Sequence, residues 1–367
     1  MTRYLRRFER VEAIRVGIPL RRPFLTARGP VTVRKSWILR LRDSDGHDGF
    51  GEIALDPAAS ATDEADLGAA VRDAVAELAG SSGPGHDVAV LDNPMARAVT
   101  AGLDGALEWL TRSSAAASAA TGGSESVLVN ATLELGEPGP TTAAAVRLAV
   151  EGFVCLKLKV GNEASGTLLD RIRAVRDAVG PSIALRLDAN SSWSYDSAAE
   201  RLDELAGFDI EYVEQPLAAA DLGGHAALRR NCVVPIALDE SVASEAAVAS
   251  ILAARAADVL VVKPARVGGP RAVRAIATLA AAAGVPVVLS TFFETGIGLD
   301  AAIRVAAALP CLGPERAHGL ATAGMLEHDL LQTHVAVVAG RIAVPERPLV
   351  DEEALRRFAL ETVAANQ

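Results

Sequence analysis

The chain has few aromatic residues, few cysteines and a shortage of positive charge. Aromatic side chains make up 4% of the 367 residues although half of the chain is hydrophobic, so small apolar residues supply much of the core and closely packed helices are expected. The cysteines Cys155, Cys232 and Cys311 are odd in number and lack the spacing of a metal site. We interpret them as buried thiols in a reducing cytoplasm.

The charge balance limits the partners. A net charge of −10 argues against a nucleic acid or an anionic membrane, because both bind basic surfaces. A small anionic substrate stays compatible, because one pocket can be positive on an acidic protein. The N-terminus lacks the apolar stretch of a secretion signal, and the run Ala275–Leu289 is broken by Gly284 and Pro286, which predicts helix, turn and strand. We expect a cytoplasmic protein, with assembly into a homo-oligomer left open.

The first third of the chain has the pattern of an α+β module. Residues 11–60 contain two strand-like stretches, VEAIRVGIPL and SWILRLRD, separated by turn signals. Residues 62–118 then carry apolar positions at helical spacing. Strands followed by helices favour an α+β domain. The small, polar stretch Ser113–Ser124 indicates a boundary, so we assign residues 1–124 to the first domain.

The middle of the chain repeats a strand-like run followed by a helix-like run. The polar residues that end successive runs lie 26, 25 and 24 residues apart, from Asp188 to Glu214, to Asp239 and to Lys263. This period fits one strand and one helix per unit, as in a barrel of parallel strands. An open doubly wound sheet is the main alternative, but the glycine-rich turn that it usually carries near its first strand is missing.

These repeats predict a modified TIM barrel, (β/α)7β, over residues 125–324. The last part of the chain, residues 325–367, returns to a strand-like sequence, HVAVVAGRIAV. We predict that this tail rejoins the first domain. The fold class is therefore α/β, with a capping domain built from both ends of the chain.

Charged residues interrupt barrel strands that should be uniformly apolar. Lys157 and Lys159 are two residues apart, so they point to the same side of their strand. Polar residues close the following strands in the same way: Asp188 and Asn190, then Glu214, then Asp239 and Glu240, then Lys263. Barrel active sites lie where the strands end, so these side chains are expected to converge. Ordinary buried ion pairs are the alternative, and the repetition in register on successive strands argues against it.

Three carboxylates that converge would repel one another unless a cation joined them. Asp188, Glu214 and Asp239 offer hard oxygen ligands, which favour Mg²⁺, with Mn²⁺ as the expected substitute. A divalent ion and three lysines outweigh the charge of these carboxylates. The site is therefore predicted to bind a small carboxylate, and no other cofactor.

Lysines beside such a metal can remove a proton from carbon next to a carboxylate. The reaction creates an enediolate that the metal stabilises. The base must be neutral first, and a neighbouring metal and a second ammonium both lower the pKa of a lysine. Lys157 and Lys159 supply that arrangement, and Lys263 is expected to approach the substrate from the opposite face.

The order KxK, DxN, E, DE and K at these spacings resembles the enolase superfamily, and within it the muconate-lactonizing subgroup. GFGE (residues 49–52) resembles the capping domain of that family, and DANSSW, EQP and DES resemble its strand-end motifs. The mandelate-racemase subgroup is a poorer match, because it places a catalytic histidine on the seventh strand and VVLSTFFETGIG contains none. We expect none of the six histidines to be a ligand.

VVKPARVGG, FETGIG and HGLATAGML are most similar to o-succinylbenzoate synthases, which dehydrate a hydroxylated cyclohexadiene carboxylate that carries a succinyl group in menaquinone biosynthesis. The resemblance implies that Lys159 is the base, that Lys157 neutralises the carboxylate and that Lys263 stabilises the intermediate. It implies the metal ligands Asp188, Glu214 and Asp239, and a flexible capping loop at Phe24–Gly29. Five residues are expected around them or at the substrate: Asn190, Glu240, Arg266, Glu294 and Asn130.

Two other functions stay open. Lys159 and Lys263 could also exchange a proton on opposite faces of an α-carbon, as an N-succinylamino acid racemase or a dipeptide epimerase requires, and KPARVGG with Arg266 resembles the branch in which both activities occur. The second is a barrel that binds a metal or ligand without catalysis. A barrel without catalysis would be expected to lack one of the lysines or carboxylates named above, but the sequence contains every one of them.

Overall fold

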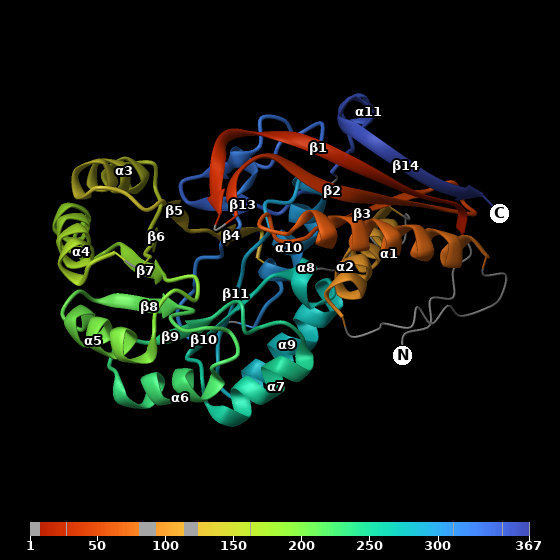
Figure 1. Ribbon diagram of the computed structural model, residues 1–367. Helices are drawn as coiled ribbons and strands as arrows, with labels where there is room; N and C mark the ends of the chain where they lie inside the picture. The colour runs from red at the N-terminus through yellow and green to blue at the C-terminus, as the bar shows by residue number, and fades with distance from the viewer. Residues whose placement is uncertain are drawn as a thin grey trace.

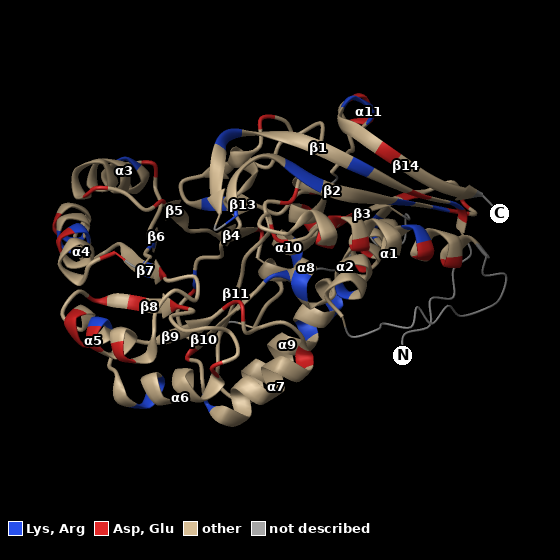
Figure 2. Ribbon diagram, viewed as in Figure 1, with Lys and Arg blue, Asp and Glu red and all other residues tan. Residues whose placement is uncertain are grey.

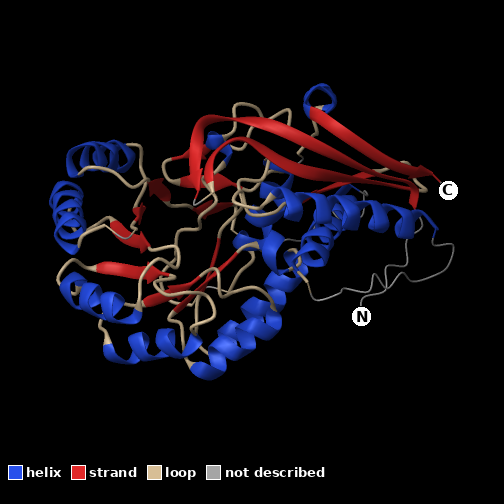
Figure 3. Ribbon diagram, in the orientation of Figure 1, coloured by secondary structure: helices blue, strands red, loops and turns tan. Residues whose placement is uncertain are grey.

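The computed structural model describes residues 8–26, 28–80, 93–113, 124–161, 163–310, 312–346 and 348–366. Most of its strands form a four-stranded antiparallel sheet beside a curled parallel sheet that helices surround, and three short strands form a further antiparallel sheet (Figures 1 and 3). The predicted boundary at 113–124 lies mostly outside the described residues, so the three domain ranges stay a prediction. Within the described part of the chain, every helix is either too short or too polar to traverse a lipid bilayer.

The antiparallel sheet joins the two ends of the chain. Its order is β14-β1-β2-β3, and α1 and α2 pack against it. Because β14 pairs with β1, the end of the tail returns to the N-terminal part as predicted. The strand-like sequence at residues 334–344 does not take part in this return, because its residues 341–343 pair with residues 126–128. The elements are β1 (Phe8–Thr26), β2 (Gly29–Asp43), β3 (Asp48–Ile53), α1 (Ala61–Gly80), α2 (Pro94–Ser113), α11 (Glu352–Phe358) and β14 (Ala359–Asn366).

The GFGE sequence explains how closely β3 approaches α2. A Cβ atom on Gly51 would lie 1.8 Å from the carbonyl oxygen of Gly102, and one on Gly49 would lie 2.3 Å from that of Ala106. Only glycine fits at either position, because no neighbouring backbone can yield by that distance. The two glycines therefore bring the strand against the helix and leave Glu52, the next polar residue, at the boundary with the barrel.

The parallel sheet contains seven strands in sequence order, as barrel repeats predict. They are β5 (Ala131–Leu133), β6 (Cys155–Lys159), β7 (Ala184–Asp188), β8 (Ile210–Glu214), β9 (Ile236–Leu238), β10 (Val259–Val262) and β11 (Val287–Leu289). The connecting helices are α3 (Pro138–Val150), α4 (Ser165–Val179), α5 (Tyr195–Leu205), α6 (Leu222–Asn231), α7 (Glu245–Ala254), α8 (Pro264–Val267), α9 (Pro270–Ala282) and α10 (Gly296–Ala307). Their apolar faces and the outward side chains of the strands form one continuous core.

A short segment closes the ring of strands. His318 bridges Val129 on one side and Gly319 bridges Ser290 on the other, both in parallel orientation. The predicted (β/α)7β barrel with an α+β capping domain is thereby confirmed.

The first strand differs from the prediction. The run from Val127 to Leu135 breaks at Asn130. Its first part, β4 (Ser126–Leu128), pairs with β13 (Arg341–Ala343), which also pairs with β12 (Val337–Val338). A 3-10 turn, η2 (Ala323–Met325), lies in the tail.

Candidate active site

A cavity of about 530 Å³ lies at the carboxyl ends of the barrel strands. Lys157, Lys159, Asp188, Asp239 and Lys263 line it together. The tip of the β1–β2 hairpin covers it from the capping domain, through the side chains of residues 24–26. Side chains that the sequence spreads over more than 100 residues thus share one chamber.

The three predicted metal ligands end neighbouring strands. Asp188 and Glu214 are the last residues of β7 and β8 and are paired in register, and Asp239 follows β9 directly. Figure 2 shows acidic residues on β8, whose last residue is Glu214. Burial raises the pKa of the Glu214 carboxyl to about 7, although Lys157 opposes the shift. Burial acts in the same direction on Asp239, but Arg266 and Lys263 outweigh it and hold its pKa below the usual range.

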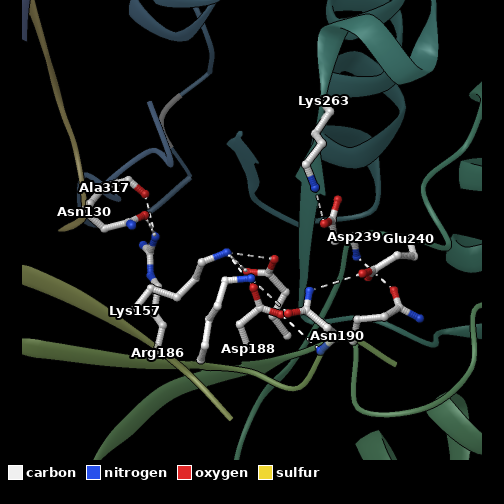
Figure 4. A network of polar contacts seen from close by, with 12 residues as sticks. Asn130, Lys157, Arg186, Asp188, Asn190, Asp239, Glu240, Lys263 and Ala317 are labelled. Atoms are coloured by element: carbon white, nitrogen blue, oxygen red, sulfur yellow. Dashed lines mark hydrogen bonds and ion pairs between the residues drawn. The ribbon is translucent and has the colours of Figure 1, made fainter. Parts of the chain in front are cut away.

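Lysines approach these carboxylates from different directions (Figure 4). The Nζ atom of Lys157 lies 2.9 Å from Asp188 and 3.1 Å from Glu214. Burial lowers the pKa of Lys157, but the two carboxylates raise it well above its ordinary value. The Nζ atom of Lys263 contacts Asp239 from the other side of the cavity.

Lys159 has a different environment from Lys157. It contacts no carboxylate among the described residues, and its Nζ atom donates to Oδ1 of Asn190 at 3.1 Å. The ammonium also lies 5.3 Å from the centre of the Phe24 ring, at the hairpin tip. Lys159 is therefore the amine of the β6 pair that faces open cavity.

Arg266 and Glu240 complete the wall beside Asp239. Nη1 of Arg266 donates to the Asp239 carboxylate at 2.6 Å and to its carbonyl at 2.8 Å. Oε1 of Glu240 accepts a hydrogen bond from Asn190 at 3.4 Å, whereas its buried Oε2 atom has no partner among the described residues. Burial raises the pKa of the Glu240 carboxyl, and the neighbouring Asp239 adds to the shift.

The donor set fits a hard divalent cation. Asp188, Glu214 and Asp239 supply carboxylate oxygens from neighbouring strands, and no soft ligand stands among them. Lys157 lies between Asp188 and Glu214, and Lys263 contacts Asp239. These ammonium groups neutralise the same carboxylates that would bind the metal. The buried, unpartnered Oε2 atom of Glu240 leaves one more oxygen in the same wall.

A tighter group of potential ligands lies far from the cavity, in the β2–β3 turn. Ligand atoms of Asp43, Asp45 and His47 lie within 4.8 Å of one another. Oδ1 of Asp43 already accepts the backbone N–H groups of Asp45 and His47, at 3.0 and 2.9 Å. This arrangement is a hydrogen-bonded turn, and we assign no metal to it.

Glu294, which was expected near the metal or the substrate, does not line the cavity. Glu294 is 5% exposed and lies behind the cavity wall, where burial and Glu52 raise its pKa to about 7. The N–H groups that begin α10 are already bound. Oε2 of Glu52 accepts those of Thr295 and Gly298, at 2.9 and 3.2 Å. A carboxylate of the capping domain therefore satisfies N–H groups at the start of this helix.

Asn130 also lies outside the cavity. Its Oδ1 atom accepts a hydrogen bond from the buried guanidinium of Arg186 at 3.3 Å, and the same guanidinium donates to the Ala317 carbonyl at 2.6 Å (Figure 4). The reason is the break in the first strand, which places Asn130 between β4 and β5 and below the level of the cavity. Thr132 and Glu134, which follow the break, line the cavity instead.

Two parts of the cavity were not predicted from the sequence: the apolar wall at Phe292 and Phe293, and a second covering loop at residues 56–58. Phe292 lies under both Lys263 and Arg266, with its ring centre 5.4 and 5.1 Å from their charged ends. Phe293 packs edge-on against Phe24 at 4.7 Å. The residues after β3, 56–58, also line the cavity. The paired phenylalanines in VVLSTFFETG were the available signal in a chain so poor in aromatic residues.

The predicted capping loop at Phe24–Gly29 is the end of a hairpin. Phe24 pairs with Val31, and Thr26 pairs with Gly29 across the turn. The segment does cover the cavity, but as paired strands. Its flexibility stays a prediction.

The family model "Enolase C-terminal domain-like" matches residues 141–348. An o-succinylbenzoate synthase from Thermobifida fusca is 40% identical over 236 residues, which are 62% of this chain and 71% of that protein. An L-Ala-D/L-Glu epimerase from Bacillus subtilis is 32% identical over 311 residues, 81% of this chain and 84% of that protein.

A crystal structure of the muconate lactonizing enzyme from Pseudomonas fluorescens, complexed with muconolactone, has the same fold. It superposes with a TM-score of 0.83 at 24% identity and covers 97% of this chain and 100% of that one.

Proposed function

The chain belongs to the enolase superfamily of enzymes, and from this membership we propose that it is an o-succinylbenzoate synthase, a magnesium-dependent carbon–oxygen lyase. The observation that carries the proposal is the placement of amines around one cavity. Lys157 and Lys159 lie on β6, and Lys263 lies on the opposite side of the same cavity, against Asp239. The 40% identity to the Thermobifida fusca o-succinylbenzoate synthase supports the choice of reaction.

Lys159 is the proposed base because it is the β6 amine without a carboxylate partner among the described residues. It removes the proton from the carbon beside the ring carboxylate, and the electron pair of that C–H bond delocalises onto the carboxylate oxygens, from which it returns to form the new ring double bond when the hydroxyl group leaves. The bond to the hydroxyl group then breaks on the same face. The hydroxide takes the proton back from Lys159 and leaves as water, so the ring becomes aromatic.

The other amines stabilise charge during these steps. Lys157 lies at the end of the cavity where the substrate carboxylate would lie, and its raised pKa keeps it cationic. Lys263 faces the opposite side of the ring, with Arg266 beside it. Asp188, Glu214 and Asp239 would hold Mg²⁺, or Mn²⁺ in its place, and the ion would supply positive charge to the carboxylate oxygens as they become more negative. The substrate is thus a small organic acid.

Ultraviolet absorbance tests the proposal directly, because aromatisation of the cyclohexadiene changes the spectrum. The purified chain should convert the substrate in the presence of Mg²⁺ and lose this activity in EDTA. Restoring Mg²⁺ should restore turnover. A metal-loaded, folded protein that leaves the substrate unchanged would exclude the proposed reaction.

Racemisation of an N-succinylamino acid, or epimerisation of a dipeptide, is the second candidate. Lys159 and Lys263 on two sides of one α-carbon suit that reaction as well, and the Bacillus subtilis epimerase matches a larger share of this chain than the synthase does. Incubation of each enantiomer of an N-succinylamino acid with the protein in deuterated water separates the candidate functions. Deuterium incorporation with inversion supports the racemase. Binding of a carboxylate without exchange or dehydration would support a barrel that binds without catalysis.

The proposed reaction would place the protein in menaquinone biosynthesis and in the cytoplasm. Cys155 and Cys232 are free thiols, which are typical of a reducing compartment. Cys232 is half-buried and not buried as expected, and Cys311 lies outside the described residues. Cys155 is buried, and burial raises its pKa to about 12, so it is an unreactive core residue. Neighbouring genes for other steps of menaquinone synthesis would strengthen this placement.

A further inference from the structure

Three alternate backbone carbonyls at the end of β6 each accept a hydrogen bond from a buried side chain. This pattern fixes the strand end that bears Lys159 and the loop that follows it. The donors are Nη1 of Arg171 to the Lys159 carbonyl at 3.1 Å, Nε1 of Trp193 to the Gly161 carbonyl at 3.0 Å, and Nη2 of Arg201 to the Glu163 carbonyl at 2.6 Å.

Two of these donors are buried arginines. Arg171 is 0% exposed, and its guanidinium pairs with the Glu163 carboxylate as well as with the Lys159 carbonyl, while its Nε atom has no hydrogen-bond partner among the described residues. Nη1 of Arg201 is likewise buried and unpartnered there, while the guanidinium lies 5.1 Å from the centre of the Trp193 ring. A buried donor without a partner destabilises a fold. Arg171 therefore joins the Lys159 carbonyl to the Glu163 carboxylate, and Arg201 holds the Glu163 carbonyl, so the two guanidinium groups fix the backbone on both sides of Gly161.

The amine end of Lys159 is fixed from the same turn as Trp193. Asn190 accepts the hydrogen bond of the Lys159 ammonium, and Trp193 lies three residues later. Asn190 and Ser191 have φ angles of 44° and 61°, in the left-handed region. This bend folds the chain back after β7. One turn therefore holds both the backbone that bears Lys159 and its reactive nitrogen.

We propose that Trp193 and Arg171 are positioning residues that fix Lys159 for proton transfer, without touching the substrate. The inference rests on the proposed role of Lys159 as the base. Proton transfer is sensitive to such placement, because a displacement of about 1 Å at the reacting atoms lowers a rate by about 100-fold. Movement of the Lys159 backbone by a fraction of this distance should therefore be visible in kcat.

Trp193→Phe is the sharpest test, because it keeps an aromatic ring under Arg201 and deletes the N–H donor. We expect kcat to fall by about 10-fold while KM changes by less than about 2-fold, since the lost contact acts on the proton transfer and not on binding. The isotope effect with substrate deuterated at the α-carbon should rise, because proton transfer becomes more rate-limiting. Arg171→Lys keeps one buried donor and should give a smaller change in the same direction.

Arg176→Lys is the matched control. Arg176 lies on the same helix as Arg171 and also binds backbone carbonyls, among them those of Gly180 and Ile183, but these precede β7 at the end away from the cavity. The control should lose thermal stability and keep the kcat and isotope effect of the parent. If Trp193→Phe lowers kcat only as far as its folded fraction falls, with an unchanged isotope effect, the positioning role is wrong.

Amide hydrogen exchange separates this inference from the proposed function. In Trp193→Phe the peptide covering residues 160–165 should exchange faster than in the parent, and in Arg176→Lys it should not. A parent that turns over neither class of carboxylate would end the proposed function, and the exchange result would then decide the positioning alone. Unchanged exchange at 160–165 in Trp193→Phe would overturn it.

Discussion

Two groups of buried acids stand on opposite sides of the wall formed by Phe292 and Phe293. The cavity cluster comprises Asp188, Glu214 and Asp239, and the interface cluster comprises Glu52 and Glu294. Each contains one glutamic acid, Glu214 or Glu294, whose pKa burial raises to about 7. Burial of acidic residues alone therefore does not distinguish an active site from a structural interface between the cap and the barrel.

The partners distinguish the two clusters. The cavity cluster faces the amines of Lys157 and Lys263, which end in the open cavity. The interface cluster faces one buried guanidinium, Arg34, and the fixed N–H groups of α10. A Cβ atom on Gly298 would lie 2.8 Å from the Cβ of Glu294 and 3.0 Å from Oε2 of Glu52, so no room remains for a ligand there. The open cluster suits catalysis, and the closed one suits attachment of the cap.

The largest expected contrast is in turnover. Lys159→Ala and Lys263→Ala should each lower kcat by about 1,000-fold, the contribution of a positioned acid or base, and leave the fold intact by circular dichroism. Glu294→Gln, on the other side of the wall, should keep turnover within about 2-fold under the same principle. Near-normal activity in Lys159→Ala would show that another group is the base.

The pH dependence of stability should reveal the interface cluster. Folded Glu294 holds a proton up to a pH of about 7, whereas the unfolded chain releases it near 4.5. The folded state therefore binds more protons in this window, and its stability falls as the pH rises. Glu294→Gln removes this loss, so the variant should gain up to about 3 kcal/mol relative to the parent between pH 4.5 and 8. Urea unfolding at several pH values measures the difference, and a constant difference between parent and variant would refute it.

Metal binding should act on the cavity cluster alone. At 100 times its dissociation constant Mg²⁺ should stabilise the parent by about 2.7 kcal/mol, by mass action on the folded state. Glu294→Gln should show the same gain, and Glu214→Gln should lose most of it. Thermal unfolding with Mg²⁺ and with EDTA gives the comparison. Equal gains in both variants would place the ion elsewhere.

The sequence predicted the cavity cluster because its residues interrupt apolar strands at a regular period. Lys157, Asp188 and Asp239 all line the predicted cavity, since the position at a strand end fixes where a side chain points. The interface cluster was not predicted. Asp239 follows β9 directly, whereas Glu294 comes five residues after the end of β11, and the packing of Glu52 from the cap shows that its side chain turns to the other side.

Local pattern also failed where two segments compete for one place. Asn130 reads as the end of a strand, but Leu128 pairs with Arg341 of the tail, which breaks the run and lowers Asn130 to the barrel floor. The prediction of a loop at the hairpin tip was wrong because strand pairing extends into it. The family resemblance implied a capping loop at Phe24–Gly29, yet Phe24 and Thr26 pair with Val31 and Gly29 across the turn.

The smallest expected effect concerns Glu52, which joins the cap to the barrel. Its Oε2 atom accepts three hydrogen bonds, from the backbone and hydroxyl of Thr295 and from Gly298, and its Oε1 atom accepts one from Ser36. Glu52→Ala leaves these donors unmet at the start of α10 and should cost about 2 kcal/mol. Glu52→Gln can offer its oxygen to α10 and its amide to Ser36, so it should recover more than half of that loss by urea unfolding at pH 7. An alanine variant as stable as the parent would mean that apolar packing alone attaches the cap, and that the interface cluster is a consequence of the fold and does not hold it together.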